Sequence, residues 1–212
     1  MKNIVLFDMD GTLTPPRGSL EISLLPVLEE LSQHAEIGIV TGSNYNYLKQ
    51  QLGLLLDHPT IRNKLHLLPC NGTKHFYPPS TSDGRHTLVS ETDMINEIGR
   101  SNFQQVMLTL INQQSNFLSR LKHYLNLKRI DNLEIKLGGD TSFDIFPTGW
   151  DKTYCLNHFP DYNHWFIGDR CGENGNDKEI YDALQLTQQS YETSSPEQTK
   201  HLIKLISEKI QA

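Results

Sequence analysis

Short apolar segments recur along the chain, and each is followed by a turn rich in Gly, Asp, Ser or Asn. An apolar run bounded by such turn residues predicts a buried strand. Between these runs apolar residues recur every three or four positions, as at Leu20, Leu24, Leu28 and Leu31, which predicts amphipathic helices. We expect strands over 4–8, 37–41, 65–69, 164–168 and 186–191, and helices over 19–33, 47–52, from 150, from 176 and over 196–210. This alternation is typical of an α/β protein with a parallel sheet.

The middle of the chain follows a different pattern. Segments 73–77 and 86–89 predict one hairpin, and segments 133–137 and 142–146 predict a second. The stretch between them, 94–127, is amphipathic and lacks Pro; as one helix it would be roughly 50 Å long at ~1.5 Å per residue. Because a crossover in a small sheet is shorter than that, we expect a cap inserted into the core. The expected division is core over 1–84, a reduced cap over 85–146 and core again over 147–212.

Composition restricts the class of protein. The 212 residues are enough for one or two compact units. The formal net charge is −6, from 25 acidic and 19 basic residues, so no nucleic-acid partner is expected. No apolar run is long enough for a membrane span or a secretion signal, and we therefore expect a cytoplasmic protein without a membrane partner. The three cysteines are expected to be reduced, and His75 and His86 are expected at the surface.

The first predicted strand delivers two carboxylates into a Gly-Thr turn. Asp8 and Asp10 lie two residues apart, and side chains at this spacing in an extended segment project from the same face. Two carboxylates at one strand end repel each other, and Mg²⁺, which prefers oxygen ligands, relieves that repulsion. The alternative is an ordinary acidic turn. The continuation into Gly-Thr-Leu-Thr favours a phosphoryl-transfer site.

Further polar groups are expected at the same edge of the sheet, where α/β folds bind their ligands. Thr41, Gly42 and Ser43 follow the second strand, and hydroxyl and N–H groups there can hold a phosphate. Asp169 ends a later strand. Lys152, at the start of a predicted helix, can neutralise charge on a nucleophile and on a transferring phosphoryl group. Together these residues predict metal-assisted phosphoryl transfer with an aspartate nucleophile.

Longer segments of the chain resemble one family. Segments 8–17, 37–40, 142–156, 168–169 and 175–177 are similar to the haloacid dehalogenase (HAD) superfamily and, within it, to the eukaryotic-type phosphomannomutases. They lie towards both ends of the chain, and the block 142–156 is the most specific to the family. The resemblance implies a HAD-like Rossmannoid parallel sheet core with a small inserted α+β cap of the C2 type. It also implies Mg²⁺-dependent chemistry on a phosphosugar substrate.

The resemblance implies roles for the acidic residues. Asp8 is expected to attack phosphorus and form a phosphoaspartate, with Asp10 as general acid and then base. Mg²⁺ is expected to bind the Asp8 carboxylate, the Asp10 backbone carbonyl and Asp169, while Asp177 supports the metal site. The alternative for Asp169 is a helix cap.

The same resemblance implies residues that bind the substrate. Ser43 and Lys152 are expected to bind the transferring phosphoryl group, and Thr41 competes with Ser43 for the role of the motif hydroxyl. Expected at the sugar are Arg17, Ser142 and Asp144. The alternatives are an ordinary loop position for the arginine, an outward strand face for the serine and aspartate, and a solvated surface pair for the lysine.

The cap is expected to be shorter than that of the family. Phosphomannomutases grip the second phosphate of a bisphosphorylated sugar with an Arg-rich segment that is not found between 122–131 and 133–137. A shorter cap admits water to the phosphoaspartate, so the main expectation is a hexose-phosphate phosphatase. Phosphomannomutase is the alternative, a non-catalytic binding module is a third, and a monomer or weak dimer is expected. Other cations could rebuild the clamp: Arg85, Arg100, Arg120, Lys122, Lys128 and Arg129.

Overall fold

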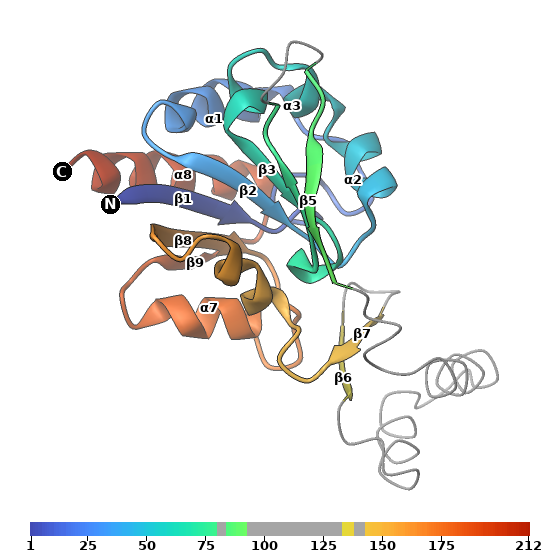
Figure 1. The fold of residues 1–212 in the computed structure, drawn as a ribbon. Coiled ribbons are helices and arrows are strands. Elements are labelled where there is room, and N and C mark those ends of the chain that lie inside the picture. Colours follow the sequence, from blue (N-terminus) through green and yellow to red (C-terminus); the bar gives the residue numbers. More distant parts are fainter. Residues whose placement is uncertain (80–83, 93–132, 138–142) are drawn as a thin grey trace, which may run out of the picture.

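The computed structural model describes residues 1–79, 84–92, 133–137 and 143–212. Its main element is a seven-stranded sheet with the order β5-β4-β3-β2-β1-β8-β9 (Figure 1). The strands are β1 (Lys2–Phe7), β2 (Glu36–Val40), β3 (Leu65–Leu68), β4 (Lys74–Tyr77), β5 (Thr87–Glu91), β8 (Tyr162–Gly168) and β9 (Ser190–Glu192). Five strands, from β3 to β9, pair in parallel, and β4 and β5 add an antiparallel edge. The predicted α/β class is confirmed.

Helices pack on both faces of the sheet. They are α1 (Leu25–Ser32), α2 (Tyr45–Gln51), α3 (Gly53–Asp57), α7 (Lys178–Gln185) and α8 (Pro196–Gln211), with 3₁₀ turns at Ile22–Leu24, Ile61–Lys64, Cys70–Gly72 and Lys152–His158. Side chains of β1 alternate between the faces: Val5 and Phe7 pack with α1 and α8, whereas Ile4 and Leu6 pack with α7 and the last of the 3₁₀ turns. Burial on both faces explains the continuous apolar sequence of this strand.

Some predicted boundaries differ from the observed ones. The helix predicted over 19–33 begins only at Leu25, after a 3₁₀ turn, because Pro26 lacks an N–H and is favourable in the first turn of a helix. The helix predicted from Trp150 is the 3₁₀ turn Lys152–His158. Strand β9 begins later than predicted.

Both predicted hairpins are present. Strand β4 pairs with β5, and β6 (Leu133–Leu137) pairs with β7 (Phe143–Pro147) in a separate two-stranded sheet. Strand β5 belongs to the seven-stranded sheet, although the expected division assigns residues from 85 onward to the cap. The predicted long amphipathic stretch over 94–127 lies outside the described residues, and the domain division stays a prediction.

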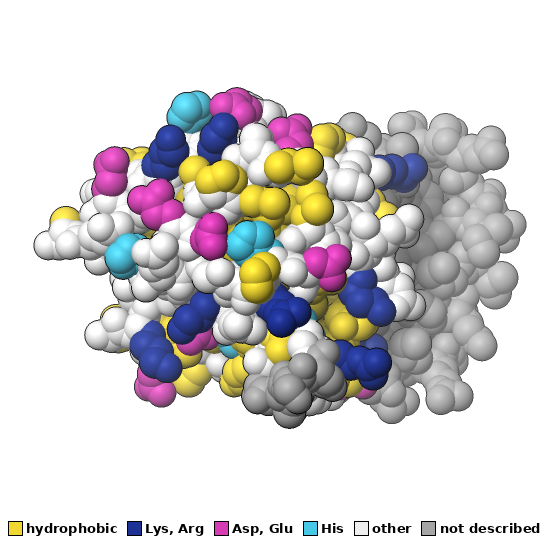
Figure 2. Space-filling model, turned by 90° about the horizontal axis from the view of Figure 1, so that it is seen from above, with side chains coloured by type: hydrophobic (Ala, Val, Ile, Leu, Met, Phe, Trp, Pro, Cys, Tyr) yellow, Lys and Arg dark blue, Asp and Glu magenta, His cyan; other side chains and the backbone are white. Residues whose placement is uncertain are grey.

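The surface mixes side chains of different kinds. The face shown in Figure 2 carries acidic, basic and apolar side chains. Among the large apolar side chains, Ile22, Leu54 and Val89 are exposed; single exposures of this kind are usual for a globular protein. Within the described part of the chain, no helix has the length and apolar character needed to cross a membrane.

A buried pair of histidines lies on the antiparallel side of the sheet. His75 Nε2 lies 2.9 Å from His66 Nδ1, and His66 Nε2 lies 2.5 Å from Glu36 Oε2. His75 is 1% exposed, and the prediction that it lies at the surface is wrong. His86 is half-buried and bonds the Leu65 carbonyl at 2.8 Å. Removal from water lowers the pKa of His75 to about 3, and the neighbouring histidines add to this shift.

This histidine pair adjoins the turn that carries Lys152. The ring centroid of His158 lies 4.5 Å from that of His75, and His158 Nε2 donates to the Gly72 carbonyl at 2.7 Å. Gly72 has φ +85, and a Cβ there would lie 2.7 Å from the Cβ of Cys155. The close contact therefore requires glycine, and it fixes the turn Lys152–His158 against the end of β3.

The buried His75 predicts a pH-dependent stability. Its pKa is about 3 in the folded protein and 6.5 without the fold, so the unfolded chain binds more protons between these values. The free energy of unfolding should therefore fall as the pH is lowered from about 6.5 towards 3. Each pKa unit corresponds to about 1.4 kcal/mol, and the loss should reach a few kcal/mol in chemical denaturation series.

Two variants test the assignment to His75. His75→Gln should flatten the pH dependence, because the buried titrating group is removed. His34→Gln changes an exposed histidine and should leave the dependence unchanged. The same slope in the wild-type protein and in His75→Gln would contradict a buried neutral His75.

Candidate active site

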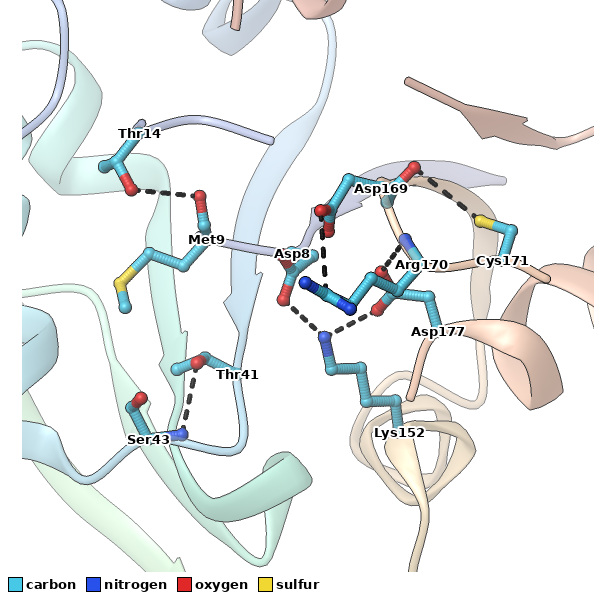
Figure 3. Close-up of polar contacts among 11 residues, drawn as sticks. Asp8, Met9, Thr14, Thr41, Ser43, Lys152, Asp169, Arg170, Cys171 and Asp177 are labelled. Atoms are coloured by element: carbon cyan, nitrogen blue, oxygen red, sulfur yellow. Dashed lines mark hydrogen bonds and ion pairs between the residues drawn. The ribbon is translucent and has the colours of Figure 1, made fainter. Parts of the chain in front are cut away.

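The carboxyl ends of three adjacent strands carry the predicted polar groups. Strand β1 lies between β2 and β8, so Asp8, Thr41 and Asp169 emerge at the same edge of the sheet (Figure 3). The Asp8 N–H donates to the Ile167 carbonyl at 2.9 Å, which extends the β1–β8 pairing to this edge. Asp8 is only 6% exposed. The structure brings these side chains together, as their positions after the strands predict.

Lys152, the first residue of the turn Lys152–His158, is fully buried and points toward Asp8 and Asp177 (Figure 3). Its Nζ donates to Asp8 Oδ1 and, at 2.6 Å, to Asp177 Oδ1. A solvated pair with Asp151 is therefore excluded; Asp151 instead caps the 3₁₀ turn by accepting the Thr153 N–H at 2.8 Å. Burial opposes the charge on Lys152, but the carboxylates of Asp177 and Asp8 outweigh it and hold the pKa of Lys152 above its ordinary value. Lys152 is thus a buried ammonium.

Three carboxylates surround this ammonium. One oxygen from each of Asp8, Asp169 and Asp177 lies within 4.8 Å of the others. Burial raises the pKa of Asp8 well above its usual range, against the opposing pull of Lys152, and burial with the nearby Asp177 raises the pKa of Asp169 to about 6. Asp169 Oδ1 is buried without a hydrogen-bond partner among the described residues. An excess of carboxylates with an unpaired oxygen fits a hard cation such as Mg²⁺.

Two glycines allow the carboxylates to approach so closely. Gly11 has φ +88, and a Cβ there would collide with the Asp169 carboxylate. A Cβ on Gly168 would lie 2.6 Å from Asp177 Oδ2, and the same oxygen accepts the Arg170 N–H at 3.0 Å. Any larger residue at either position would displace a carboxylate. The glycines of the Asp-Gly-Thr and Gly-Asp motifs are therefore part of the site.

Asp10 does not belong to this group of three carboxylates. Its Oδ1 accepts the backbone N–H of Arg17 at 2.8 Å and the hydroxyl of Tyr47 at 3.4 Å. The contribution to a metal site predicted for Asp10 involves its backbone carbonyl, and its carboxylate is predicted to act in proton transfer. The contact of Tyr47 with Asp10 was not predicted from the sequence, because a tyrosine at this position of a helix cannot be distinguished from a packing residue.

The 3₁₀ turn Cys70–Gly72 holds the loop that follows β2. Thr41 Oγ1 accepts the Ser43 N–H at 3.2 Å, with Gly42 between them. The N–H of Cys70 donates to the Ser43 carbonyl at 3.0 Å, and that of Asn71 donates to the Thr41 carbonyl at 2.8 Å. Sequence reasoning did not assign this turn to the site. The pair Asn71 and Gly72, shortly after β3, is the sequence signal that could have identified this turn. Asn and Gly adopt the left-handed backbone conformation most readily.

The residues predicted to contact the sugar are described in part. Arg17 is exposed, has φ +57 and reaches Asp10 through its backbone N–H. Asp144 lies in β7 opposite Lys136 of β6. Ser142 lies outside the described residues. Their roles stay predictions.

Comparison with known proteins identifies relatives over most of the chain. A model of the eukaryotic phosphomannomutase family matches residues 95–209. Phosphomannomutase 1 of Dictyostelium discoideum is 31% identical over 241 aligned positions, which cover 94% of each protein. A phosphomannomutase of Arabidopsis thaliana is 32% identical over 92% of this chain and 93% of the relative.

Solved structures share the fold. IMP-nucleotidase of Plasmodium falciparum, with IMP bound, superposes with a TM-score of 0.71 at 16% identity and covers 98% of this chain and 68% of that one. The protein SMU.1108c of Streptococcus mutans covers 100% of both chains with a TM-score of 0.66 at 14% identity. These likenesses concern the fold alone. Given the fold and relatives near 30% identity along almost its whole length, the chain belongs to the eukaryotic phosphomannomutase family and is a HAD-type phosphotransferase.

Proposed function

We propose that the protein is a Mg²⁺-dependent phosphomannomutase, which interconverts mannose 1-phosphate and mannose 6-phosphate. The observation that carries the choice of a mutase is the identity of about 30% with phosphomannomutases along almost the whole chain. The buried Lys152 ammonium between Asp8 and Asp177, beside a third carboxylate, supports the phosphoryl transfer. Every charged residue expected for catalysis is present in the sequence, which disfavours a non-catalytic binding module.

The proposed chemistry transfers a phosphoryl group to and from Asp8. The phosphoaspartate gives its phosphoryl group to a free hydroxyl of a hexose monophosphate, and the hydroxyl proton passes to Asp10. The bisphosphorylated sugar then reorients. Asp8 attacks the other phosphorus in line, the bond from that phosphorus to the sugar oxygen breaks, and Asp10 returns the proton to this oxygen. Asp8 is phosphorylated again and a hexose monophosphate with the other position phosphorylated is released.

The charged residues around Asp8 suit this chemistry. Mg²⁺, when bound, supplies a Lewis acid for the phosphoryl oxygens, and Asp8, Asp169 and the Asp10 backbone carbonyl would hold it with support from Asp177. Lys152 donates to Asp8 and neutralises part of its charge, which reduces the repulsion between the nucleophile and an incoming phosphate. Burial restricts the movement of Lys152, Asp8 and Asp177, so little reorganisation of these three groups is needed for the proposed reaction.

The remaining predicted residues would bind the phosphosugar. We assign the phosphoryl oxygens to the loop of Thr41, Gly42 and Ser43, and the hydroxyl-bearing sugar to Arg17, Ser142 and Asp144. A charged fork with polar neighbours suits a hydroxylated ligand rather than an apolar one. We further propose a cytoplasmic location and a monomer or weak dimer.

A hexose-phosphate phosphatase is the second candidate. The alignment with the Dictyostelium discoideum relative runs over 241 positions, whereas this chain has 212 residues. The relative therefore contains segments that this chain lacks, which agrees with the shortened cap expected from the sequence. Hydrolysis, the main expectation from the sequence, is not confirmed, and the relatives fit the mutase better.

Phosphorus NMR distinguishes these two functions. With Mg²⁺, α-mannose 1-phosphate and a trace of hexose 1,6-bisphosphate, we expect the mannose 6-phosphate signal to appear, because the bisphosphate primes Asp8. Release of inorganic phosphate alone would instead identify the phosphatase. Without the bisphosphate, formation of mannose 6-phosphate should be slower.

The Asp8→Asn variant is the control for this experiment. It removes the attacking carboxylate and should reduce turnover by about a thousandfold or more. Asp182→Asn changes a half-exposed carboxylate on α7 and should turn over as the wild-type protein does. Equal activity of Asp8→Asn and the wild type would contradict the assignment of Asp8.

Removal of Mg²⁺ should lower the thermal stability. The three carboxylates repel one another, so Mg²⁺ added to EDTA-treated protein should raise the unfolding temperature until the site is saturated. Asp169→Asn should shift the midpoint of this titration to at least about tenfold higher Mg²⁺, because one oxygen ligand is lost. The same variant should unfold at a higher temperature than the wild type in EDTA, since a buried like charge is removed.

Asp182→Asn again serves as the matched control, and its Mg²⁺ titration should follow that of the wild type. If Asp169→Asn also gave the wild-type titration, the cation would not bind at this cluster.

A further inference from the structure

The carboxylate of Asp10 is held by a side chain from outside its own loop. The Tyr47 hydroxyl lies 3.4 Å from Asp10 Oδ1, and the Arg17 N–H donates to the same oxygen at 2.8 Å. Tyr47 belongs to α2, which follows the loop after β2, whereas Asp10 and Arg17 follow β1. Both donors meet one oxygen of the carboxylate.

The Tyr47 hydroxyl is itself oriented by a buried polar chain. The Gln51 side chain, one turn further along α2, lies close to the Tyr47 hydroxyl and lowers the pKa of Tyr47. The Gln51 carbonyl oxygen lies 3.3 Å from the Thr14 hydroxyl, which also lies 3.2 Å from the Met9 carbonyl. With Gln51 Oε1 facing Thr14, the amide nitrogen faces Tyr47, and the Tyr47 hydrogen is directed to Asp10. Thr14 and Gln51 are buried, whereas Tyr47 and Asp10 are half-buried.

The backbone fixes the same arrangement. The Asn44 side chain accepts the Tyr47 N–H at 3.0 Å and caps α2, and the Leu20 N–H donates to the Gln51 carbonyl at 3.0 Å. The Tyr47 ring also packs against the main apolar core. Burial and the nearby Asp10 raise the pKa of Tyr47, so its hydroxyl stays a donor near neutral pH.

We infer that Tyr47 is a positioning residue for the proton transfers of Asp10. By donating to Oδ1 together with the Arg17 N–H, it fixes the carboxylate plane and leaves Oδ2 as the oxygen that gives a proton to the leaving sugar oxygen and takes one from the attacking hydroxyl. Tyr47 keeps its own proton throughout. The inference rests on the proposed function, because it requires Asp10 to act as acid and base.

Two substrates separate this role from simple packing. In the turnover of mannose 1-phosphate, the bisphosphorylated sugar releases an alkoxide when Asp8 attacks it, and this alkoxide needs a proton from Asp10 as the bond to phosphorus breaks. 4-Nitrophenyl phosphate releases a stable nitrophenolate, so phosphorylation of Asp8 by it needs no proton, whereas the later attack of water on the phosphoaspartate needs Asp10 as base. A residue that positions Asp10 must therefore affect the release of the alkoxide and the attack of water on the phosphoaspartate. It must leave the phosphorylation of Asp8 by 4-nitrophenyl phosphate unchanged.

The experiment compares Tyr47→Phe with Tyr45→Phe, which removes the same atom from a tyrosine stacked on Phe76 with ring centroids 4.0 Å apart. For Tyr47→Phe we expect a kcat on mannose 1-phosphate about tenfold lower at unchanged KM. The rate of the nitrophenolate burst in rapid mixing should stay within about twofold of the wild type, while the steady-state rate that follows should fall about tenfold. Tyr45→Phe should match the wild type in all three measurements.

Other outcomes overturn the inference. Wild-type kinetics in Tyr47→Phe would show that the contact has no role, and a loss of burst rate equal to the loss of kcat, or a change in KM alone, would show a packing or substrate-binding role. Gln51→Met removes the amide close to the Tyr47 hydroxyl and should lower kcat and the steady-state rate by a smaller factor, with the burst rate unchanged. This variant keeps the test decisive if Tyr47→Phe unfolds. Absence of turnover in the wild-type protein with both substrates would overturn the proposed function itself, whereas failure of the inference alone leaves wild-type turnover intact.

Discussion

The buried ammonium of Lys152 is the interaction on which the site depends. Transfer of a charge from water to a protein interior costs several kcal/mol unless it is matched by opposite charge and hydrogen bonds. Asp8 and Asp177 provide this match, and they come from the end of β1 and from the residue that precedes α7. Three segments that are distant in the sequence are therefore held at one point, and removal of any of these side chains leaves a buried charge without its partner.

The same cluster carries more negative than positive charge. Asp169 adds a third carboxylate to the one ammonium, and its pKa of about 6 shows that its charged form is opposed by burial and by Asp177. Gly11 and Gly168 bring the carboxylates closer than any other residue would allow. The backbone thus holds together groups that repel one another, which is an arrangement typical of a site that is complete only with a bound cation.

Much of this site follows from the sequence, because each strand ends in a residue that bears the chemistry. Asp8, Thr41 and Asp169 could be predicted to meet, since adjacent parallel strands deliver their ends to one edge. The environments of Tyr47 and His75 could not be predicted, because only the tertiary structure determines which groups a tyrosine on a helix or a histidine in a strand contacts. The turn at Cys70 holds the loop after β2 through backbone N–H groups, and its only signal in the sequence is the pair Asn71 and Gly72.

The choice between mutase and phosphatase does not lie in the groups around Asp8. In the proposed chemistry, Lys152 and the carboxylates assist the formation of a phosphoaspartate whichever acceptor follows, and Asp10 takes a proton from water or from a sugar hydroxyl alike. The outcome depends on which acceptor reaches the phosphorus while Asp10 is held in place. Retention of a bisphosphorylated sugar requires a group that binds its second phosphate, and in the proposed function the residues around Asp8 bind the first. The group of charged residues around Asp8 is therefore compatible with either fate of a phosphoaspartate.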